Sequence, residues 1–141
     1  MAADTARLRR LQRLEKVRAI ARQTAAREAA EAEGTLAQLT ALAERTARMA
    51  DAYRAQAGPA LAHDLRQMES FASGLRGISR ATSGDANRAR SLADRKQQAL
   101  AAAERARSAV EDRAGAEARS LTRQRQQLVL GARRAVGTGL E

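Results

Sequence analysis

The residue types that carry most enzymatic and metal chemistry are sparse in this chain, and none of them lies at a spacing typical of a site. His63 is the single histidine, and the 141 residues contain no cysteine. Thiolate metal sites and disulfide frameworks are therefore excluded. Because no nucleophile and no second ligand accompany His63 in the sequence, we expect it to be an exposed residue in the first turn of a helix.

The carboxylates and glycines do not form a recognisable chemical motif either. Acid pairs such as Glu111 and Asp112 fit a charged helix face with local ion pairs. Paired carboxylates act as acid and base only where an enclosed pocket separates their pKa values. The glycines are scattered and form no phosphate-binding loop between a strand and a helix. The sequence therefore predicts a binding or mechanical protein without catalytic, cofactor-binding or metal-binding residues.

The composition is that of long helices rather than of a compact core. Aromatic residues make up 1% of the chain, as Tyr53 and Phe71. Much of the apolar content is alanine, which has the highest helix propensity and lets helices approach closely. No apolar run reaches the ~20 residues that a spanning helix needs, and the first residues lack an apolar signal segment. We expect a cytoplasmic protein without membrane insertion.

The only proline divides the chain into two helices. Gly58 suits the residue just past a helix end, and Pro59 suits the first turn of a new helix. These residues predict an all-α fold in one domain, residues 1–141, that forms a long antiparallel two-helix coiled-coil hairpin. The predicted parts are a helix over about 4–56, a turn over 57–60, a helix over about 61–134 and a frayed tail over 135–141.

Apolar residues at helical spacing predict which faces of the two helices meet. The first helix opens with steps of three, at Leu8, Leu11, Leu14, Val17 and Ile20. Steps of three and four follow, at Leu39, Leu42, Thr46, Met49, Tyr53 and Gln56. The second helix continues the pattern at Leu61, Leu65, Met68, Ala72, Leu75 and Ile78. An alanine-rich part then follows, at Leu92, Ala99, Ala103, Ala106, Val110, Ala114, Glu117, Leu121 and Leu128. Alternating steps of three and four define the seam of a coiled coil.

One interruption leaves a second architecture open. Ser83, Gly84 and Asp85 lie inside the second predicted helix. Glycine there weakens the helix, and a Ser–Gly pair favours a kink. Alternatively these residues form a second turn, with Asp85 capping a third helix in a three-helix bundle.

A tight turn at Gly58 and Pro59 predicts the register of the hairpin. Residues whose numbers sum to about 117 then lie opposite each other. Met49 is expected near Met68, Leu42 near Leu75, Leu39 near Ile78, and Leu8 near Ser108. Residues after about Val110 have no partner in the first helix.

The positive charge is concentrated towards the two ends of the chain. The net charge is +10, whereas residues 29–83 hold six arginines and six acids. Nucleic acid, an anionic membrane and an acidic protein are the partner classes that such charge suits. The chain has too few aromatic residues to bind nucleic acid by base stacking. The apolar residues near the N-terminus are expected inside the hairpin, so they would not be available to bind a membrane. A protein partner is favoured, and a basic coiled coil that binds nucleic acid non-specifically stays the alternative.

Several short stretches resemble the FliJ-type proteins of the flagellar export apparatus and their type III secretion counterparts. The opening Leu8-x2-Leu11-x2-Leu14-Glu15 is similar to the start of that family. Tyr53-Arg54 resembles the second of the family's two tyrosines, and Met49 stands at the position of the first. Phe71-x3-Leu75-x2-Ile78, which follows Leu65-x2-Met68, resembles the start of the family's second helix. The resemblance covers about residues 7–125.

The resemblance implies a non-enzymatic stalk in a protein export machine. Members insert a coiled coil into the hexameric export ATPase, stimulate it, and contact the export-gate membrane protein and export chaperones. Such a protein is cytoplasmic and peripheral to the membrane-bound apparatus. The gate-contacting residues carried over to this chain are Leu42, Met49, Tyr53, Phe71, Leu75 and Ile78. The basic residues expected to face the ATPase are Arg7, Arg9, Arg10, Arg13, Arg105 and Arg107.

Overall fold

The computed structural model describes residues 2–56 and 62–137, and all but Gln56 of these lie in two α-helices. Helix α1 runs over Ala2–Ala55 and helix α2 over Ala62–Gly137. The sequence therefore placed the helix boundaries to within three residues, and the all-α hairpin is confirmed. The predicted turn at Gly58 and Pro59, with Leu61, lies outside the described residues.

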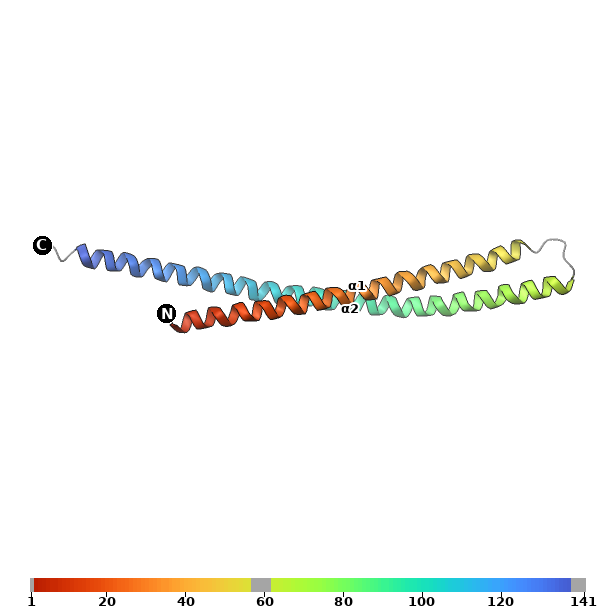
Figure 1. The fold of residues 1–141 in the computed structure, drawn as a ribbon, viewed down its shortest axis with the longest axis horizontal. Helices are drawn as coiled ribbons and strands as arrows, with labels where there is room; N and C mark the ends of the chain where they lie inside the picture. Colours follow the sequence, from red (N-terminus) through yellow and green to blue (C-terminus); the bar gives the residue numbers. More distant parts are fainter. Residues whose placement is uncertain (1, 57–61, 138–141) are drawn as a thin grey trace. The chain divides into compact units, whose positions relative to one another are not determined.

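The chain divides into two compact units, each an antiparallel pair of helical segments. Unit 2 comprises residues 26–99, and in Figure 1 it is the orange-to-yellow part of α1 beside the green part of α2. Unit 1 comprises residues 1–25 and 100–141, where the red part of α1 lies beside the blue part of α2. Each unit pairs one segment of α1 with one segment of α2 and has its own seam.

The alternative architecture, a three-helix bundle with a second turn at residues 83–85, is wrong. Helix α2 passes without interruption through Ser83, Gly84 and Asp85, and no described glycine has a positive φ. Asp85 pairs with Arg88 one turn later in the same helix instead of capping a new helix. On either side of Gly84, Thr82 and Ala86 are buried. Since burial of these neighbours against α1 outweighs the ~1 kcal/mol propensity cost of glycine, the helix continues.

The helices meet along an alanine-rich seam in unit 2. The seam positions of α1, buried or half-buried at alternating steps of three and four, are Ala29, Ala32, Leu36, Leu39, Ala43, Thr46 and Ala50. Those of α2 are Leu65, Met68, Ala72, Leu75, Ser79, Thr82, Ala86, Ala89, Ala93 and Lys96. Ala50 and Ala72 are fully buried at 0% exposure. Small side chains therefore form the centre of this coiled coil.

The predicted seam of α1 was wrong at three of its bulky positions, of which Tyr53 is 37% exposed. Leu42 and Met49 remain 41% and 45% exposed, whereas the adjacent Ala43 and Ala50 are buried. In α2, Ile78 is likewise 55% exposed and Ser79 takes the seam position. Two alanine faces allow a close approach, which leaves a bulkier side chain next to the seam partly uncovered.

Unit 1 continues the same repeat with more polar seam residues. Its α1 positions, all half-buried, are Asp4, Leu8, Leu11, Glu15, Arg22 and Ala25. Its α2 positions, half-buried or buried, are Leu100, Ala103, Arg107, Val110, Ala114, Glu117 and Leu121. The expected stripe of Leu14, Val17 and Ile20 is not part of this seam, because these side chains are 40%, 59% and 63% exposed. Steps of exactly three move round the helix and leave the seam after Leu11.

The register differs from the predicted one by one heptad. In unit 2, Tyr53 contacts Phe71 and Glu28 pairs with Lys96; in each pair the residue numbers sum to 124 rather than 117. Arg7 pairs with Glu117 in unit 1, which gives the same sum. The expected pairings of Met49 with Met68, Leu42 with Leu75, Leu39 with Ile78, and Leu8 with Ser108 are therefore wrong.

Because of this shift, α1 covers more of α2 than expected. In unit 1 the start of α1 lies level with about residue 122, and Figure 1 shows α2 continuing past it. Residues 123–137 are helical and exposed. The segment of α2 that the described part of α1 does not cover is therefore shorter than predicted. It begins after about residue 122, whereas the prediction placed its start after Val110.

Candidate partner-binding surfaces

An exposed apolar surface runs along one side of unit 2. We call it the apolar flank, and it consists of Leu42, Met49, Tyr53, Phe71 and Ile78. The exposed fractions of these side chains range from 37% for Tyr53 to 55% for Ile78. Two helices contribute to the flank, so it exists as one surface only in the folded hairpin.

The heptad repeat explains why these residues share a side. Leu42 and Met49 each precede a seam alanine of α1, and Phe71 and Ile78 each precede a seam residue of α2. When two helices run antiparallel, the residues at this flanking position of both helices lie on the same side of the seam. The register places Met49 between Phe71 and Ile78. The four side chains therefore alternate between the two helices.

An aromatic pair closes one end of the apolar flank. The ring centroids of Tyr53 and Phe71 are 4.7 Å apart, and the ring planes are tilted by 55°. Tilted aromatic pairs at this distance are favourable by ~1 kcal/mol beyond the area that they bury. The contact joins α1 to α2 and orders both rings at the surface.

The opposite side of unit 2 is small and polar. An open groove of about 290 Å³ there is lined by Thr40, Ala43, Glu44, Ala47, Ser79, Ser83, Ala86, Asn87 and Arg90. At its base the Ser79 hydroxyl donates a hydrogen bond to the Ala43 carbonyl oxygen of the other helix, at 2.9 Å. Unit 2 thus has one apolar and one polar side, and only the apolar flank suits a protein partner that excludes water.

Five of the six residues predicted to contact the export gate belong to the apolar flank. The sixth, Leu75, lies half-buried in the seam. Phe71 was predicted to lie outside the seam, and it is 49% exposed. Leu42, Met49 and Ile78 were predicted in the seam, where helix packing would have covered them, but all three are more than 40% exposed. Their role in contacting a gate remains a prediction.

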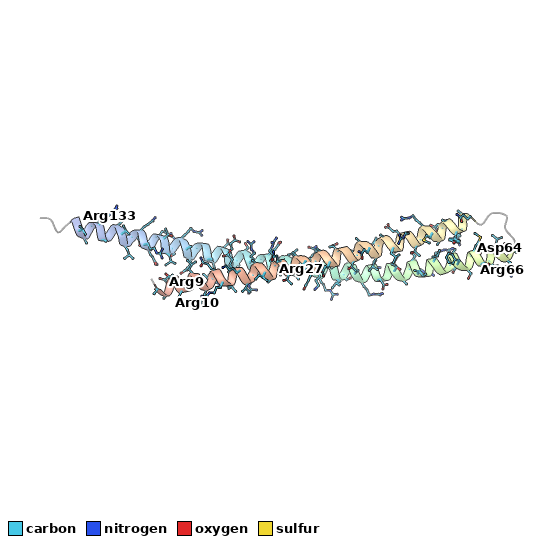
Figure 2. The ribbon with its side chains drawn as sticks, in the orientation of Figure 1. Arg9, Arg10, Arg27, Asp64, Arg66 and Arg133 are labelled. Carbon is cyan, nitrogen blue, oxygen red and sulfur yellow. The ribbon has the colours of Figure 1, made fainter. Side chains whose placement is uncertain are left out.

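The basic residues predicted to face the ATPase lie in unit 1 but form two groups. Arg9, Arg10 and Arg13 are exposed on the first turns of α1, where Figure 2 labels the first two. By the register of Arg7 and Glu117, these residues lie level with about residues 111–115 of α2. Arg105 and Arg107 lie level with residues 17–19 instead. The structure therefore does not bring all six arginines together.

Ion pairing distinguishes these arginines further. Arg7 pairs with Glu117 across the helices at 3.8 Å, and Arg107 pairs with Glu111 on its own helix at 3.5 Å. Among residues 2–56 and 62–137, no carboxylate lies within ion-pair distance of Arg9, Arg10 or Arg13. The same holds for the exposed Arg105, and of these four arginines Arg9, Arg10 and Arg13 lie together on the first turns of α1, where an acidic partner could neutralise them as a group.

Unit 1 carries most of the net charge. It holds fifteen basic and seven acidic side chains, which accounts for +8 of the net +10. The segment 123–137 of α2 contains four arginines and no acid. One of them, Arg133, is labelled near the end of α2 in Figure 2. The two basic ends of the sequence therefore belong to the same structural unit.

The sequence did not identify two further exposed apolar sets in unit 1. Leu14, Val17 and Ile20 were expected in the seam but face outward. In α2, exposed apolar residues follow the last residue that α1 covers, at Leu128, Val129, Leu130 and Val136. The sequence did contain a sign that Leu14, Val17 and Ile20 lie outside the seam. They follow in steps of exactly three, whereas a seam requires alternating steps of three and four.

The residues with the potential for chemistry are few in the part of the chain that the structure describes. His63 is exposed in the first turn of α2, as expected. Among residues 2–56 and 62–137, no three histidine, aspartate or glutamate side chains lie close enough to hold a metal ion. No helix in this part of the chain is long and apolar enough to cross a membrane.

Comparison with protein-family models, with curated proteins and with solved structures finds no match to the chain.

Proposed function

We propose that this chain is a non-enzymatic component of a flagellar or type III protein export apparatus. In this proposal unit 1 binds and stimulates the hexameric export ATPase, as a central-stalk subunit does. Unit 2 contacts the export-gate membrane protein, and export chaperones are further partners. The protein would act in the cytoplasm, at the surface of the membrane-bound apparatus.

The observation that carries this proposal is the aromatic pair at the end of the apolar flank. Tyr53 and Phe71 belong to the stretches that resemble the FliJ-type family, and they are the only aromatic residues of the chain. Both rings are exposed and in contact. Exposed aromatic side chains within an apolar surface are frequent anchors of a protein interface.

The charge of unit 1 supports the other half of the proposal. Arg9, Arg10 and Arg13 have no ion-pair partner within the described chain, and unit 1 carries +8. Arginine binds carboxylates through a planar fork of donors. An ATPase pore lined with acidic residues would neutralise these charges on binding.

The first experiment measures ATP hydrolysis by the cognate export ATPase with and without this protein, in lipid-free buffer. We expect stimulated hydrolysis. Replacing Arg9, Arg10 and Arg13 with glutamate should abolish the stimulation without loss of helical content. The matched control replaces Arg45, Arg48 and Arg54 with glutamate. These arginines of α1 lie in unit 2 and are likewise exposed, and this variant should still stimulate the ATPase.

Nucleic-acid binding is the competing function, because a unit with a charge of +8 also suits phosphates. Binding of duplex DNA is therefore measured in parallel at several salt concentrations. A protein that neutralises several phosphates loses affinity steeply as salt rises. Tight, salt-sensitive DNA binding without stimulation of the ATPase would contradict the export function.

A further inference from the structure

We propose that the outward face of α1 in unit 1 binds the surface of an anionic lipid bilayer. This face, which we call the basic–apolar face, consists of Arg9, Arg10, Arg13, Leu14, Lys16, Val17 and Ile20. The inference does not depend on the export function, because lipid alone is the ligand.

The first step is that the apolar members of this face are available. Leu14, Val17 and Ile20 would be unavailable to lipid if they formed the seam of the hairpin. Instead they are 40%, 59% and 63% exposed, and the half-buried Leu8, Leu11 and Glu15 take the seam positions. Pairing of the helices thus leaves three large aliphatic side chains outside the seam, each at least 40% exposed.

The second step is the placement of the cations. Each apolar residue is preceded four positions earlier by a basic residue: Arg10 before Leu14, Arg13 before Val17, and Lys16 before Ile20. Residues four apart are neighbours on a helix surface. A row of positive charges therefore runs beside the row of apolar side chains, as in helices that lie in the interface of an anionic membrane.

The third step is the absence of opposing charge. Residues 2–25 contain two acids, Asp4 and Glu15, and both occupy half-buried seam positions. The outward positions of this segment therefore carry only positive charge. Basic side chains next to a membrane with anionic lipids each strengthen binding by about fivefold.

The shape of the apolar row favours a bilayer over a helix or a nucleic acid. Leu14, Val17 and Ile20 follow one another in steps of three, so they spread over about 120° of the helix surface. A partner helix would need alternating steps of three and four. Nucleic acid would leave the aliphatic side chains in water, and unit 1 has no aromatic residue on which bases could stack. A bilayer surface accepts a broad apolar band with cations between its side chains, because long basic side chains reach the headgroups while the aliphatic ones enter the acyl boundary.

This binding is peripheral and excludes the ATPase. The side chains reach the boundary between headgroups and acyl chains, and the described helices are not apolar enough to cross the bilayer. Arg9, Arg10 and Arg13 serve both proposals, so one copy of unit 1 cannot hold lipid and ATPase through them at the same time.

The test is co-sedimentation of the full chain with vesicles of phosphatidylcholine containing about 30% phosphatidylglycerol, whose anionic headgroups give the bilayer a negative surface potential. We expect binding to these vesicles and none to pure phosphatidylcholine. Replacing Arg9, Arg10 and Arg13 with glutamine should weaken binding on the order of a hundredfold, at about fivefold per charge. Replacing Leu14, Val17 and Ile20 with serine should weaken it by about tenfold or more, with the helical content retained.

The matched control replaces Leu128, Val129 and Leu130 with serine. These residues belong to the same unit and are 59%, 56% and 61% exposed. The control should bind vesicles as the unmodified chain does. Unchanged binding of the Leu14, Val17 and Ile20 variant would overturn the proposal, because charge alone would then explain the affinity. Failure to bind anionic vesicles, or loss of binding in the control, would also overturn it. ATPase stimulation in lipid-free buffer is scored separately, so either proposal can fail alone.

Discussion

The rings of Tyr53 and Phe71 meet across the two helices, with centroids 4.7 Å apart. Eighteen positions separate these residues in the sequence, and the predicted register does not bring them level. The contact therefore forms only in the observed register. The end of the apolar flank, which consists of these two rings, depends on the same register. A slip of one heptad would place Tyr53 next to residues near position 64 and would divide this surface.

Replacing Phe71 with alanine should weaken binding of the export-gate protein while leaving the hairpin folded. Phe71 is 49% exposed, so the loss of the ring contact should cost only ~1 kcal/mol of stability. An interface anchor typically contributes about 2 kcal/mol or more, so affinity should fall about thirtyfold or more. Calorimetry measures the binding, and circular dichroism measures the helical content.

Two controls accompany this variant. Tyr53→Ala should weaken gate binding in the same way, because it removes the other ring of the pair. Val136→Ala, at a 75% exposed position in unit 1, should leave it unchanged. If both aromatic variants bind the gate protein as the unmodified chain does, the apolar flank is not the contact surface.

Engineered cysteines should report the register directly, because the chain has none of its own. The Ser79 hydroxyl lies 2.9 Å from the Ala43 carbonyl oxygen, so Ala43→Cys with Ser79→Cys places two thiols in reach of each other. We expect a disulfide in this double variant under mild oxidation, detected as a shift on a non-reducing gel. The control combines Ala43→Cys with Ala72→Cys. Position 72 lies one heptad before position 79, so this pair should stay reduced. Efficient cross-linking of the second pair alone would indicate the register with the sum of 117.

The buried alanines of the seam should not tolerate larger side chains. Ala29 is 1% exposed, and leucine there would force the helices apart. Overpacking of this kind costs ~1–3 kcal/mol. The adjacent Ala30 is exposed and serves as the control, since Ala30→Leu should change stability by less than about 0.5 kcal/mol. Thermal unfolding followed by circular dichroism separates the two variants, and equal melting temperatures would contradict the alanine seam.

Replacing Gly84 with alanine should stabilise the protein. Gly84 lies inside α2 without a positive φ, and a Cβ there would meet only the Arg88 guanidinium, at 4.0 Å. Alanine in a helix interior is favoured over glycine by ~1 kcal/mol. The melting temperature should rise by a few degrees. Gly34→Ala in α1, where a Cβ would meet nothing within 4 Å, should give a similar rise. A lower melting temperature for Gly84→Ala alone would indicate a turn at this position.

Some features of this protein follow from the sequence by itself. Alanine and arginine content predicts helix, and Gly58 with Pro59 predicts that two helices are present. Their boundaries at Ala2–Ala55 and Ala62–Gly137 agree with that prediction. The uneven distribution of charge is also a property of the sequence, since it needs only the order of the residues. These features are local, so no contact between distant residues is required to determine them.

The seam and the register were decided only by the tertiary structure. A heptad repeat looks the same after a shift of seven residues, so sums of 117 and 124 bring equivalent faces together. The choice depends on which pairs fit best when packed, such as Tyr53 with Phe71 and Glu28 with Lys96. The seam prediction was wrong at Leu42 and Met49 for a different reason. These side chains are larger and more hydrophobic than Ala43 and Ala50, so the sequence favoured them as seam residues. Close packing of two alanine faces buries the small residues and leaves the large ones beside them available for partners.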